Sequence, residues 1–357
     1  MKFPSSTWCA VLAILAGLPA GGAPSDPAIV RSEFIYEHGP VPSVHASTIA
    51  ELPGGDLAAA WFGGTAERNP DVCIWVSRFQ DGHWTPAANV ANGMQAGGKR
   101  FATWNPVLFQ APGGPLLLFY KVGPSPAEWW GMLMRSTDGG RSWSEPVRLP
   151  PGILGPIKDK PLLLADGTLL CGSSTEGSAH GRQVHFELTA DLGQTWTMVG
   201  PISTKEEFGA IQPTFLTHAD GRLQVICRSK DFVLCTSWSS DQGRTWSKMA
   251  SAGLYGPDTG LDAVTLADGR QLLVYNPRDH SPIGAPPGEN WKSRYPLVLS
   301  LSADGLKWVR RLVLEDEPRP NGYAYPAVIQ ASDGLLHLTY TWNRQRIKHV
   351  VIDPRRL

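Results

Sequence analysis

Basic residues recur from residue 158 onward, and together they could bind one anionic ligand. They are Lys158, Lys160, Arg228, Arg294 and Arg344. A guanidinium group binds a carboxylate through two parallel hydrogen bonds, so the set predicts a ligand that carries a carboxylate. Residues this far apart in sequence meet only if the chain returns repeatedly to one place. The elements that carry them should therefore be repeated too.

One repeat is an eight-residue pattern, Ser/Thr-x-Asp-x-Gly-x-x-Trp, found at 136–143, 189–196 and 239–246. Its Asp can accept hydrogen bonds from nearby backbone N–H groups, its Gly supplies a positive φ, and its Trp anchors the turn in an apolar slot. The pattern predicts a structural turn between two strands rather than a catalytic site.

A second repeat, a glycine-containing turn between two apolar runs, occurs six times. The turns lie at 52–57, 111–116, 165–169, 219–223, 267–272 and 332–336. Such turns between alternating strands indicate hairpins. Two hairpins per unit make a four-stranded antiparallel blade, so six units predict an all-β, six-bladed β-propeller. The sixth unit lacks its outer strand, and we expect the N-terminal stretch 29–36 to supply it and close the ring.

Polar residues fall where the innermost strands of the blades should begin. They are His45, Asn105, Lys158, Lys160, Gln212, Asp262 and Tyr325. Connections between the second and third strands should reach the same face, and the residues that they add include Glu67, Asp71, Glu176, Arg228, Arg294, Trp342 and Arg344. Polar groups are costly to bury without partners, so this arrangement predicts a wet, functional cavity in which cations outnumber anions.

Composition gives further bounds. The 357 residues include 32 basic and 32 acidic side chains, so the charge does not indicate a nucleic-acid partner. Residues 1–23 are typical of a secretory signal peptide, with an apolar run too short to span a membrane. We therefore expect residues 24–357 to form one secreted or periplasmic propeller domain, a monomer. No spacing indicates a metal or cofactor site. Cys227 and Cys235 could meet across one hairpin, so a disulfide between them is one alternative and two free thiols are the other.

The repeated turns, the six-fold period and the arginines resemble the sialidase (neuraminidase) superfamily of the Asp-box or BNR-repeat type. Sialidases hold the substrate carboxylate with three arginines and use a Tyr nucleophile assisted by a Glu, with an Asp as acid/base. Arg228 resembles the second arginine and Arg294 the third. Tyr325 matches the nucleophile.

Two positions depart from the family pattern. His45 stands where the first arginine is expected, and Gln212 stands where the Glu is expected. A Gln cannot take a proton from Tyr325. Glu67 and Asp71 are both candidates for the general acid, and Asp71 could equally cap the entry to a strand.

Three functions follow as hypotheses. The first is a secreted exo-α-sialidase-type glycoside hydrolase that removes a terminal acidic sugar, with Arg228, Arg294, Lys158 or Lys160 on the carboxylate and Trp342 against a sugar ring. The second is a polysaccharide lyase acting on uronate-containing glycans by β-elimination, with His45 or Tyr325 as base. The third is a non-catalytic propeller that binds glycans.

Overall fold

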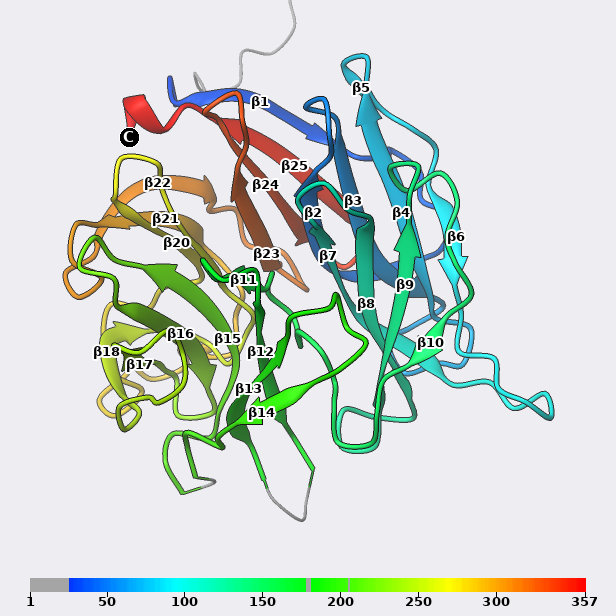
Figure 1. Ribbon diagram of the computed structural model, residues 1–357. Helices are drawn as coiled ribbons and strands as arrows, with labels where there is room; N and C mark the ends of the chain where they lie inside the picture. The colour runs from blue at the N-terminus through cyan, green and yellow to red at the C-terminus, as the bar shows by residue number, and fades with distance from the viewer. Residues whose placement is uncertain (1–25, 178–180, 205) are drawn as a thin grey trace, which may run out of the picture.

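Six small antiparallel sheets stand around a central axis in the computed structural model of the protein (Figure 1). The structure describes residues 26–177, 181–204 and 206–357. The predicted six-bladed β-propeller is confirmed. The expected signal peptide, residues 1–23, lies outside the described residues. Within the described part, no helix has the length and apolar character needed to cross a bilayer.

The first five blades follow one another in chain order. Blade one contains β2 (Ser43–Glu51), β3 (Leu57–Gly64), β4 (Cys73–Gln80), β5 (His83–Trp84) and β6 (Ala88–Ala91). Blade two contains β7 (Ala102–Gln110), β8 (Leu116–Gly123), β9 (Trp130–Ser136) and β10 (Val147–Arg148). Blade three contains β11 (Leu162–Leu163), β12 (Leu169–Thr175), β13 (Gln183–Thr189) and β14 (Thr197–Val199). Blade four contains β15 (Ala210–Thr217), β16 (Leu223–Ser229), β17 (Val233–Ser239) and β18 (Ala250–Tyr255). Blade five contains β19 (Asp262–Thr265), β20 (Gln271–Tyr275), β21 (Leu297–Ser302) and β22 (Val309–Glu315).

Blade six joins the two ends of the described chain. It contains β23 (Tyr323–Gln330), β24 (Leu336–Trp342) and β25 (Arg346–Ile352), and β1 (Ile29–Phe34) is its outer strand. β1 pairs antiparallel with β25, and a short 3-10 helix (Pro354–Arg356) follows. The N-terminal strand thus closes the ring and leaves no open edge on β25, as the sequence predicts.

The repeated eight-residue turns are held by hydrogen bonds within each turn. In the second copy, Oδ1 of Asp191 accepts hydrogen bonds from the backbone N–H groups of Gln194 and Thr195, at 2.9 and 2.8 Å. The indole N–H of Trp196 donates to the carbonyl of Gly193 at 3.1 Å. The Asp side chain is fully used in shaping the turn, so its role is structural.

Three innermost strands, β7, β15 and β23, contain a bulge near their start. The residues at the bulges are Asn105, Gln212 and Tyr325, with φ of 35°, 57° and 53°. Each precedes a proline, which has no N–H for the strand ladder. A left-handed backbone at a residue other than glycine costs on the order of 1–3 kcal/mol and is concentrated at functional sites.

Blades one and three depart from this arrangement. In β2 the residue with positive φ at the bulge is Ala46 (φ 55°), so His45 lies one position earlier than the sequence comparison of the blades predicts. In blade three the innermost strand expected to begin near Lys158 is not formed there, and β11 has only two residues. Ile157 still bonds to Gly172 of β12, after which the chain leaves the ladder to place Lys158 among other blades.

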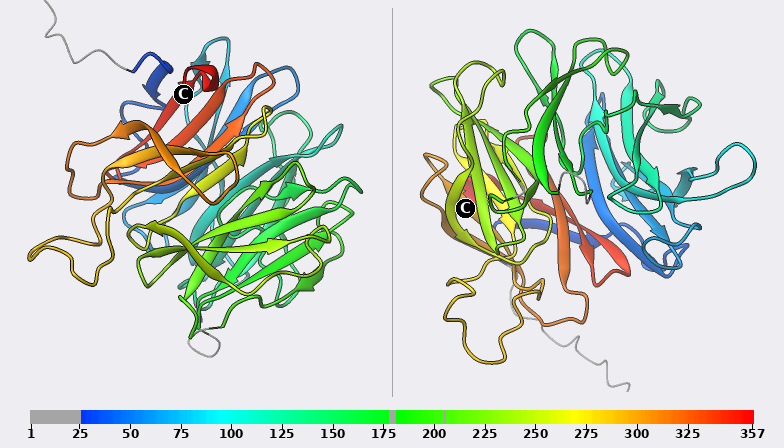
Figure 2. Two further views of the ribbon diagram at one scale, coloured as in Figure 1. Left: turned by 90° about the vertical axis from the view of Figure 1, so that its left-hand side faces the viewer. Right: turned by 90° about the horizontal axis from the view of Figure 1, so that it is seen from below.

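Antiparallel pairing in every blade puts the connections between second and third strands on one side of the ring. We call this side the connection face; it is formed by residues 65–72, 124–129, 176–177, 181–182, 230–232, 276–296 and 343–345. The connection between β20 and β21, gold in Figure 2, extends well beyond the other loops. The connection face carries the side chains of the candidate site.

Candidate active site

Tyr325 lies at the centre of a cluster of cations. Its hydroxyl oxygen accepts a hydrogen bond from Nη1 of Arg228 at 2.6 Å. The guanidinium carbons of Arg228 and Arg294 lie 5.7 and 6.0 Å from the centre of its ring, and Nζ of Lys158 lies at 5.9 Å. This arrangement favours negative charge on the phenol oxygen or on a ligand beside it.

Arg228, at the end of β16, is held by two further acceptors. Its Nε donates to Oδ1 of Asp258 at 2.8 Å, and its Nη1 donates to Oε1 of Gln212 at 3.2 Å. Gln212 therefore lies beside the Arg228–Tyr325 pair, where the family places a Glu. An amide there can position the guanidinium but cannot accept the proton of the phenol.

Arg294 differs from Arg228, because no described residue forms a hydrogen bond or ion pair with its guanidinium. Burial lowers the pKa of Arg294, and the neighbouring guanidiniums of Arg344 and Arg228 lower it further against the opposing effect of Tyr325. A partly buried cation without a counter-ion, next to two more cations, is unfavourable by itself. The arrangement is suited to binding an anion.

Arg344, in the turn between β24 and β25, brings a third guanidinium to the cluster. Its Nη1 donates to Oε2 of Glu67 at 2.6 Å, and its backbone oxygen accepts from the N–H of Val44 at 2.9 Å. Blade six thus supplies a cation beside the start of β2, the strand on which the family carries its first arginine.

A cavity of about 500 Å³ adjoins Arg294 and Arg344. Lys292 and Arg319 line it as well, and no acidic side chain of the described residues does. The Arg344–Glu67 pair and an Arg319–Glu317 pair at 2.5 Å leave Lys292 and Arg294 as the excess positive charge. Arg294 and Arg344, two of the five basic residues singled out in the sequence, thus line an electropositive hollow on the connection face.

The two candidate acids separate clearly. Glu67 lies beside Arg344 and influences Arg294. Asp71 accepts hydrogen bonds from the hydroxyl and from the backbone N–H of Thr65, the latter at 2.7 Å. The Thr65 hydroxyl lowers the pKa of the exposed Asp71, and Arg100 adds to the effect. Asp71 therefore shapes its loop, and Glu67 is the one of the two that reaches the arginine cluster.

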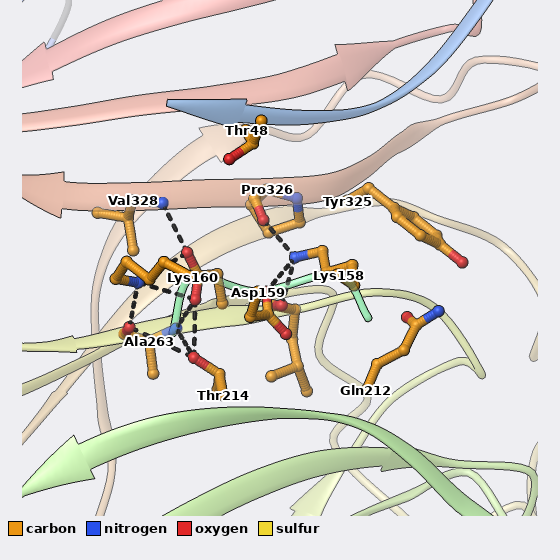
Figure 3. A network of polar contacts seen from close by, with 12 residues as sticks. Thr48, Lys158, Asp159, Lys160, Gln212, Thr214, Ala263, Tyr325, Pro326 and Val328 are labelled. Atoms are coloured by element: carbon orange, nitrogen blue, oxygen red, sulfur yellow. Dashed lines mark hydrogen bonds and ion pairs between the residues drawn. The ribbon is translucent and has the colours of Figure 1, made fainter. Parts of the chain in front are cut away.

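Lys158 is occupied by contacts inside the protein (Figure 3). Its ammonium group donates to Oδ1 of Asp159 at 2.6 Å and to the carbonyls of Leu261 and Pro326 at 2.6 and 2.5 Å. Burial raises the pKa of Asp159 well above its usual range against the opposing effect of Lys158. All three ammonium hydrogens are used, so Lys158 fastens blade three to blades five and six. The prediction that Lys158 binds the carboxylate of a ligand is therefore wrong.

Lys160 and Asp262 form the other half of this network. Nζ of Lys160 lies 3.0 Å from both carboxylate oxygens of Asp262 and donates to the carbonyl of Ala263 at 2.8 Å. Asp262 also accepts from the Thr214 hydroxyl at 2.7 Å and from the N–H of Val328 at 2.8 Å. In Figure 3 the side chains of Tyr325 and Gln212 lie on the opposite side of the view from Lys160. Lys160 and Asp262 therefore join the blades rather than contact a ligand at Tyr325.

His45 packs against Tyr325 but is closed off from solvent. The two rings lie 4.1 Å apart, and Nδ1 of His45 is 3.1 Å from the hydroxyl oxygen of Thr341. Burial lowers the pKa of His45 well below its usual range, and Arg344 and Arg294 add to this effect. The imidazole is therefore neutral, and it supports the phenol from the side.

Asn105 and Trp342 also have structural contacts. The amide of Asn105 donates to the carbonyl of Ile157 at 3.2 Å, which links blades two and three. The guanidinium carbons of Arg319 and Arg346 lie 4.5 and 4.7 Å from the Trp342 ring centre. The Trp342 ring is thus packed against two guanidiniums, and its expected role as a sugar platform stays a prediction.

Sequence reasoning missed Asp258 and Arg182 as members of the site, and it placed Glu176 on this face without giving it a role. Asp258 binds Arg228 and also accepts from Nη1 of Arg182 at 2.7 Å. Nη2 of Arg182 lies 3.9 Å from Oε2 of Glu176. Burial raises the pKa of Glu176, although Arg228 and Arg182 oppose the rise. Glu176 follows β12 at the same place in its blade as Glu67 in blade one, and this repeat position was the available signal.

Comparison with known proteins agrees with the geometry. The BNR repeat-like domain matches residues 55–338. A sialidase of Micromonospora viridifaciens is 30% identical over 220 residues, which are 50% of this chain and 33% of the relative. The chain thus spans about a third of the length of that curated relative.

Solved structures share the fold. A protein of unknown function from Dyadobacter fermentans superposes with a TM-score of 0.72 at 19% identity, covering 91% of this chain and 99% of that one. The Hadza microbial sialidase Hz136 also gives 0.72, at 18% identity, covering 88% of this chain and 66% of that one. A Trypanosoma rangeli sialidase in complex with the inhibitor DANA gives 0.67 at 16% identity, covering 88% and 56%. The protein belongs to the BNR repeat-like domain family, within the sialidase-like superfamily.

Proposed function

We propose that the protein is a glycoside hydrolase that releases a terminal acidic sugar, a sialic acid or a uronic acid, from a glycan. Arg228, Arg294 and Arg344 would hold the sugar carboxylate, and Tyr325 would face the anomeric carbon. The distant relationship to sialidases supports the same class of reaction. Tyrosine is a recognised alternative to the second carboxylate of glycosidases.

The observation that carries this proposal is the unpaired guanidinium of Arg294. The groups that influence it most are the phenol of Tyr325, the guanidiniums of Arg344 and Arg228 and the carboxylate of Glu67, and none of the described residues forms an ion pair with it. A substrate carboxylate would supply the missing counter-ion, and a charge-assisted bidentate contact is the strongest interaction that such a group can make.

Arg344 compensates for the departure at His45 in this proposal. The family carries its first arginine on the strand that opens blade one, and this chain has a neutral, buried imidazole there. Arg344 reaches the same region from the neighbouring blade, because its backbone is bonded to Val44. The three-cation arrangement is thereby retained with one cation supplied by another strand.

Gln212 changes the role of Tyr325. Without a carboxylate beside it, the phenol has no adjacent base, but the hydrogen bond from Arg228 and the nearby charge of Arg294 stabilise negative charge on its oxygen. Tyr325 would therefore act as a charge stabiliser for the positively charged transition state, or as a nucleophile in its ionised form.

The elimination reaction has weaker support. A lyase would need a base in contact with the proton beside the uronate carboxylate. His45 is 2% exposed, and its Nε2 is buried as well.

The residues 1–23 support the further proposal that the enzyme is exported to a place where it would meet extracellular glycans.

The test is incubation of the purified protein with matched sialylated and uronate-terminated oligosaccharides, followed by mass analysis of the products. Hydrolysis adds one water per bond cleaved and releases the free acidic sugar. A product with an unsaturated, ultraviolet-absorbing ring would instead identify a lyase. Binding without any product, with an Arg294→Ala variant that no longer binds, would identify a glycan-binding propeller.

A further inference from the structure

A second cavity lies on the connection face between blades two and three. It has a volume of about 450 Å³. Its walls come from the β8–β9 connection, from the segment after β10 and from the β12–β13 connection. Its chemistry differs from that of the cavity at Arg294 and Arg344, because its lining is mainly apolar, with Pro126, Trp129, Trp130 and Pro151.

Tryptophan and proline surfaces of this kind are suited to the flat, C–H-rich faces of uncharged sugar rings. Trp129 packs edge-on against the buried Trp104, with ring centres 5.9 Å apart, so its position is fixed. The guanidinium of Arg148 lies 4.5 Å from the centre of the Trp130 ring. The cavity therefore offers a rigid aromatic wall and one charged group, Arg148, that can donate hydrogen bonds to sugar hydroxyls.

Glu176 is the acidic residue that lines this cavity, and it also belongs to the arginine cluster. The neighbouring Arg182 forms its closer ion pair with Asp258, at 2.7 Å, whereas its distance to Glu176 is 3.9 Å. Arg228 likewise bonds to Asp258. Within the described residues no hydrogen bond holds Glu176 in its charged form, and burial raises its pKa. Glu67, in contrast, is bound to Arg344 at 2.6 Å.

We infer that Glu176 is the general acid of the enzyme and that the cavity of Trp129 and Trp130 binds the uncharged saccharide that Glu176 protonates as it leaves. This inference rests on the hydrolysis proposed above. It assigns the acidic sugar to the arginine cluster, the neutral sugar to the aromatic cavity, and the bond between them to the carboxyl group that borders both.

The proposed step is balanced in atoms and charge. The bond between the anomeric carbon and the glycosidic oxygen breaks, its electron pair stays on the oxygen, and that oxygen takes the proton of Glu176. Water then adds to the anomeric carbon and gives one proton to the Glu176 carboxylate. The acid is regenerated, and one water has been consumed.

Two substrates that share the acidic sugar test the inference. One is the natural-type disaccharide, whose poor leaving group needs a proton, and the other is an aryl glycoside, whose phenolate leaves without one. For Glu176→Gln we expect kcat on the disaccharide to fall by roughly 10²- to 10⁴-fold, with a much smaller loss on the aryl glycoside. In the same variant, the pH profile of kcat should lose its alkaline limb, along which the general acid of the wild type gives up its proton. The exposed Glu128→Gln is the matched control on the neighbouring connection.

The cavity is tested with Trp130→Leu, which removes the aromatic ring and keeps an apolar side chain. We expect its KM for the disaccharide to rise, with KM for the aryl glycoside unchanged. Thermal melting shows that each variant is folded. The inference would be overturned if kcat of Glu176→Gln fell equally on both substrates or did not fall at all. It would also be overturned if Glu67→Gln, and not Glu176→Gln, lost activity only on the disaccharide. In each case the proposed hydrolysis would still stand. An inactive wild type on all acidic glycans would overturn the proposed function, and the acid assignment with it.

Discussion

Nη1 of Arg228 donates a hydrogen bond to the hydroxyl oxygen of Tyr325 over 2.6 Å, although the two residues are 97 positions apart in the chain. Both side chains are largely buried. The bond joins blade four to blade six and aims a positive charge at the phenol oxygen. Electrostatic stabilisation prepared in this way requires little rearrangement during a reaction.

Removing the phenol oxygen should therefore separate catalysis from binding. For Tyr325→Phe we expect kcat to fall by at least about 10²-fold, while the dissociation constant for an acidic sugar changes by less than about tenfold. Steady-state kinetics and calorimetric titration measure the two quantities. A variant with near-normal kcat would exclude Tyr325 from the reaction.

Arg294 should contribute to binding without contributing to stability. For Arg294→Ala we expect affinity for an acidic sugar to fall roughly 10- to 150-fold, the range for hydrogen bonds to charged groups. The melting temperature should stay level or rise, because a partly buried cation without a protein counter-ion is removed. The exposed Arg311→Ala is the control. A lower melting temperature with unchanged affinity would contradict the role given to Arg294.

Restoring a carboxylate at position 212 should reveal whether Tyr325 can be a nucleophile. Gln212→Glu would place an anion about 3.2 Å from Arg228, beside the Tyr325 hydroxyl. If the phenol attacks the sugar, the added base should raise kcat by up to roughly 10²-fold at pH values above the pKa of the new carboxyl. A fall in kcat would instead favour the charge-stabilising role.

The repeated turns make stability depend on acid pH. Hydrogen bonds from Thr195 lower the pKa of Asp191 below its ordinary value. A lowered pKa in the folded state means that the stabilisation is complete above the ordinary Asp value, about 3.9, and is lost as the pH falls through the folded value. Asp191→Asn should therefore melt at a lower temperature than wild type at pH 7, and the difference should narrow below about pH 3.

The same Asp191→Asn variant should keep its substrate preference and kcat, because the turn serves the blade and not the site. Calorimetric melting across the pH range, together with kinetics at neutral pH, measures both effects. A selective loss of turnover in protein with unchanged melting would contradict the structural assignment.

The architecture was predictable because its signals are local. Each hairpin depends on a few neighbouring residues, such as the Asp191 turn, and their number gives the number of blades. The convergence of Arg228, Arg294 and Tyr325 followed from the innermost strand starts and the connections that share one face of the ring, and from the resemblance to sialidases. The bulge in β2 was not predicted. Its residue with positive φ is Ala46, an apolar residue, whereas β15 and β23 have the polar residues Gln212 and Tyr325 at the same place.

The errors concern contacts that no local pattern encodes. Lys158 had the right charge for a carboxylate ligand, but the carbonyls of Leu261 and Pro326, more than a hundred residues later, take up its hydrogens. Glu176 was overlooked as an acid because its protonation depends on burial and on Asp258, which attracts both nearby guanidiniums. Competition among distant partners is decided only in three dimensions.

The pairing of β1 with β25 has a consequence for biosynthesis. Glu33 contacts His349 at 3.1 Å across 316 positions, so the last blade cannot be completed until almost the whole chain has left the ribosome. A nascent chain can assemble the earlier sheets one by one, but it remains an open arc with a hydrogen-bonding edge. A circular permutant that joins the present ends and opens a surface hairpin would move this final step to another blade and make its rate measurable.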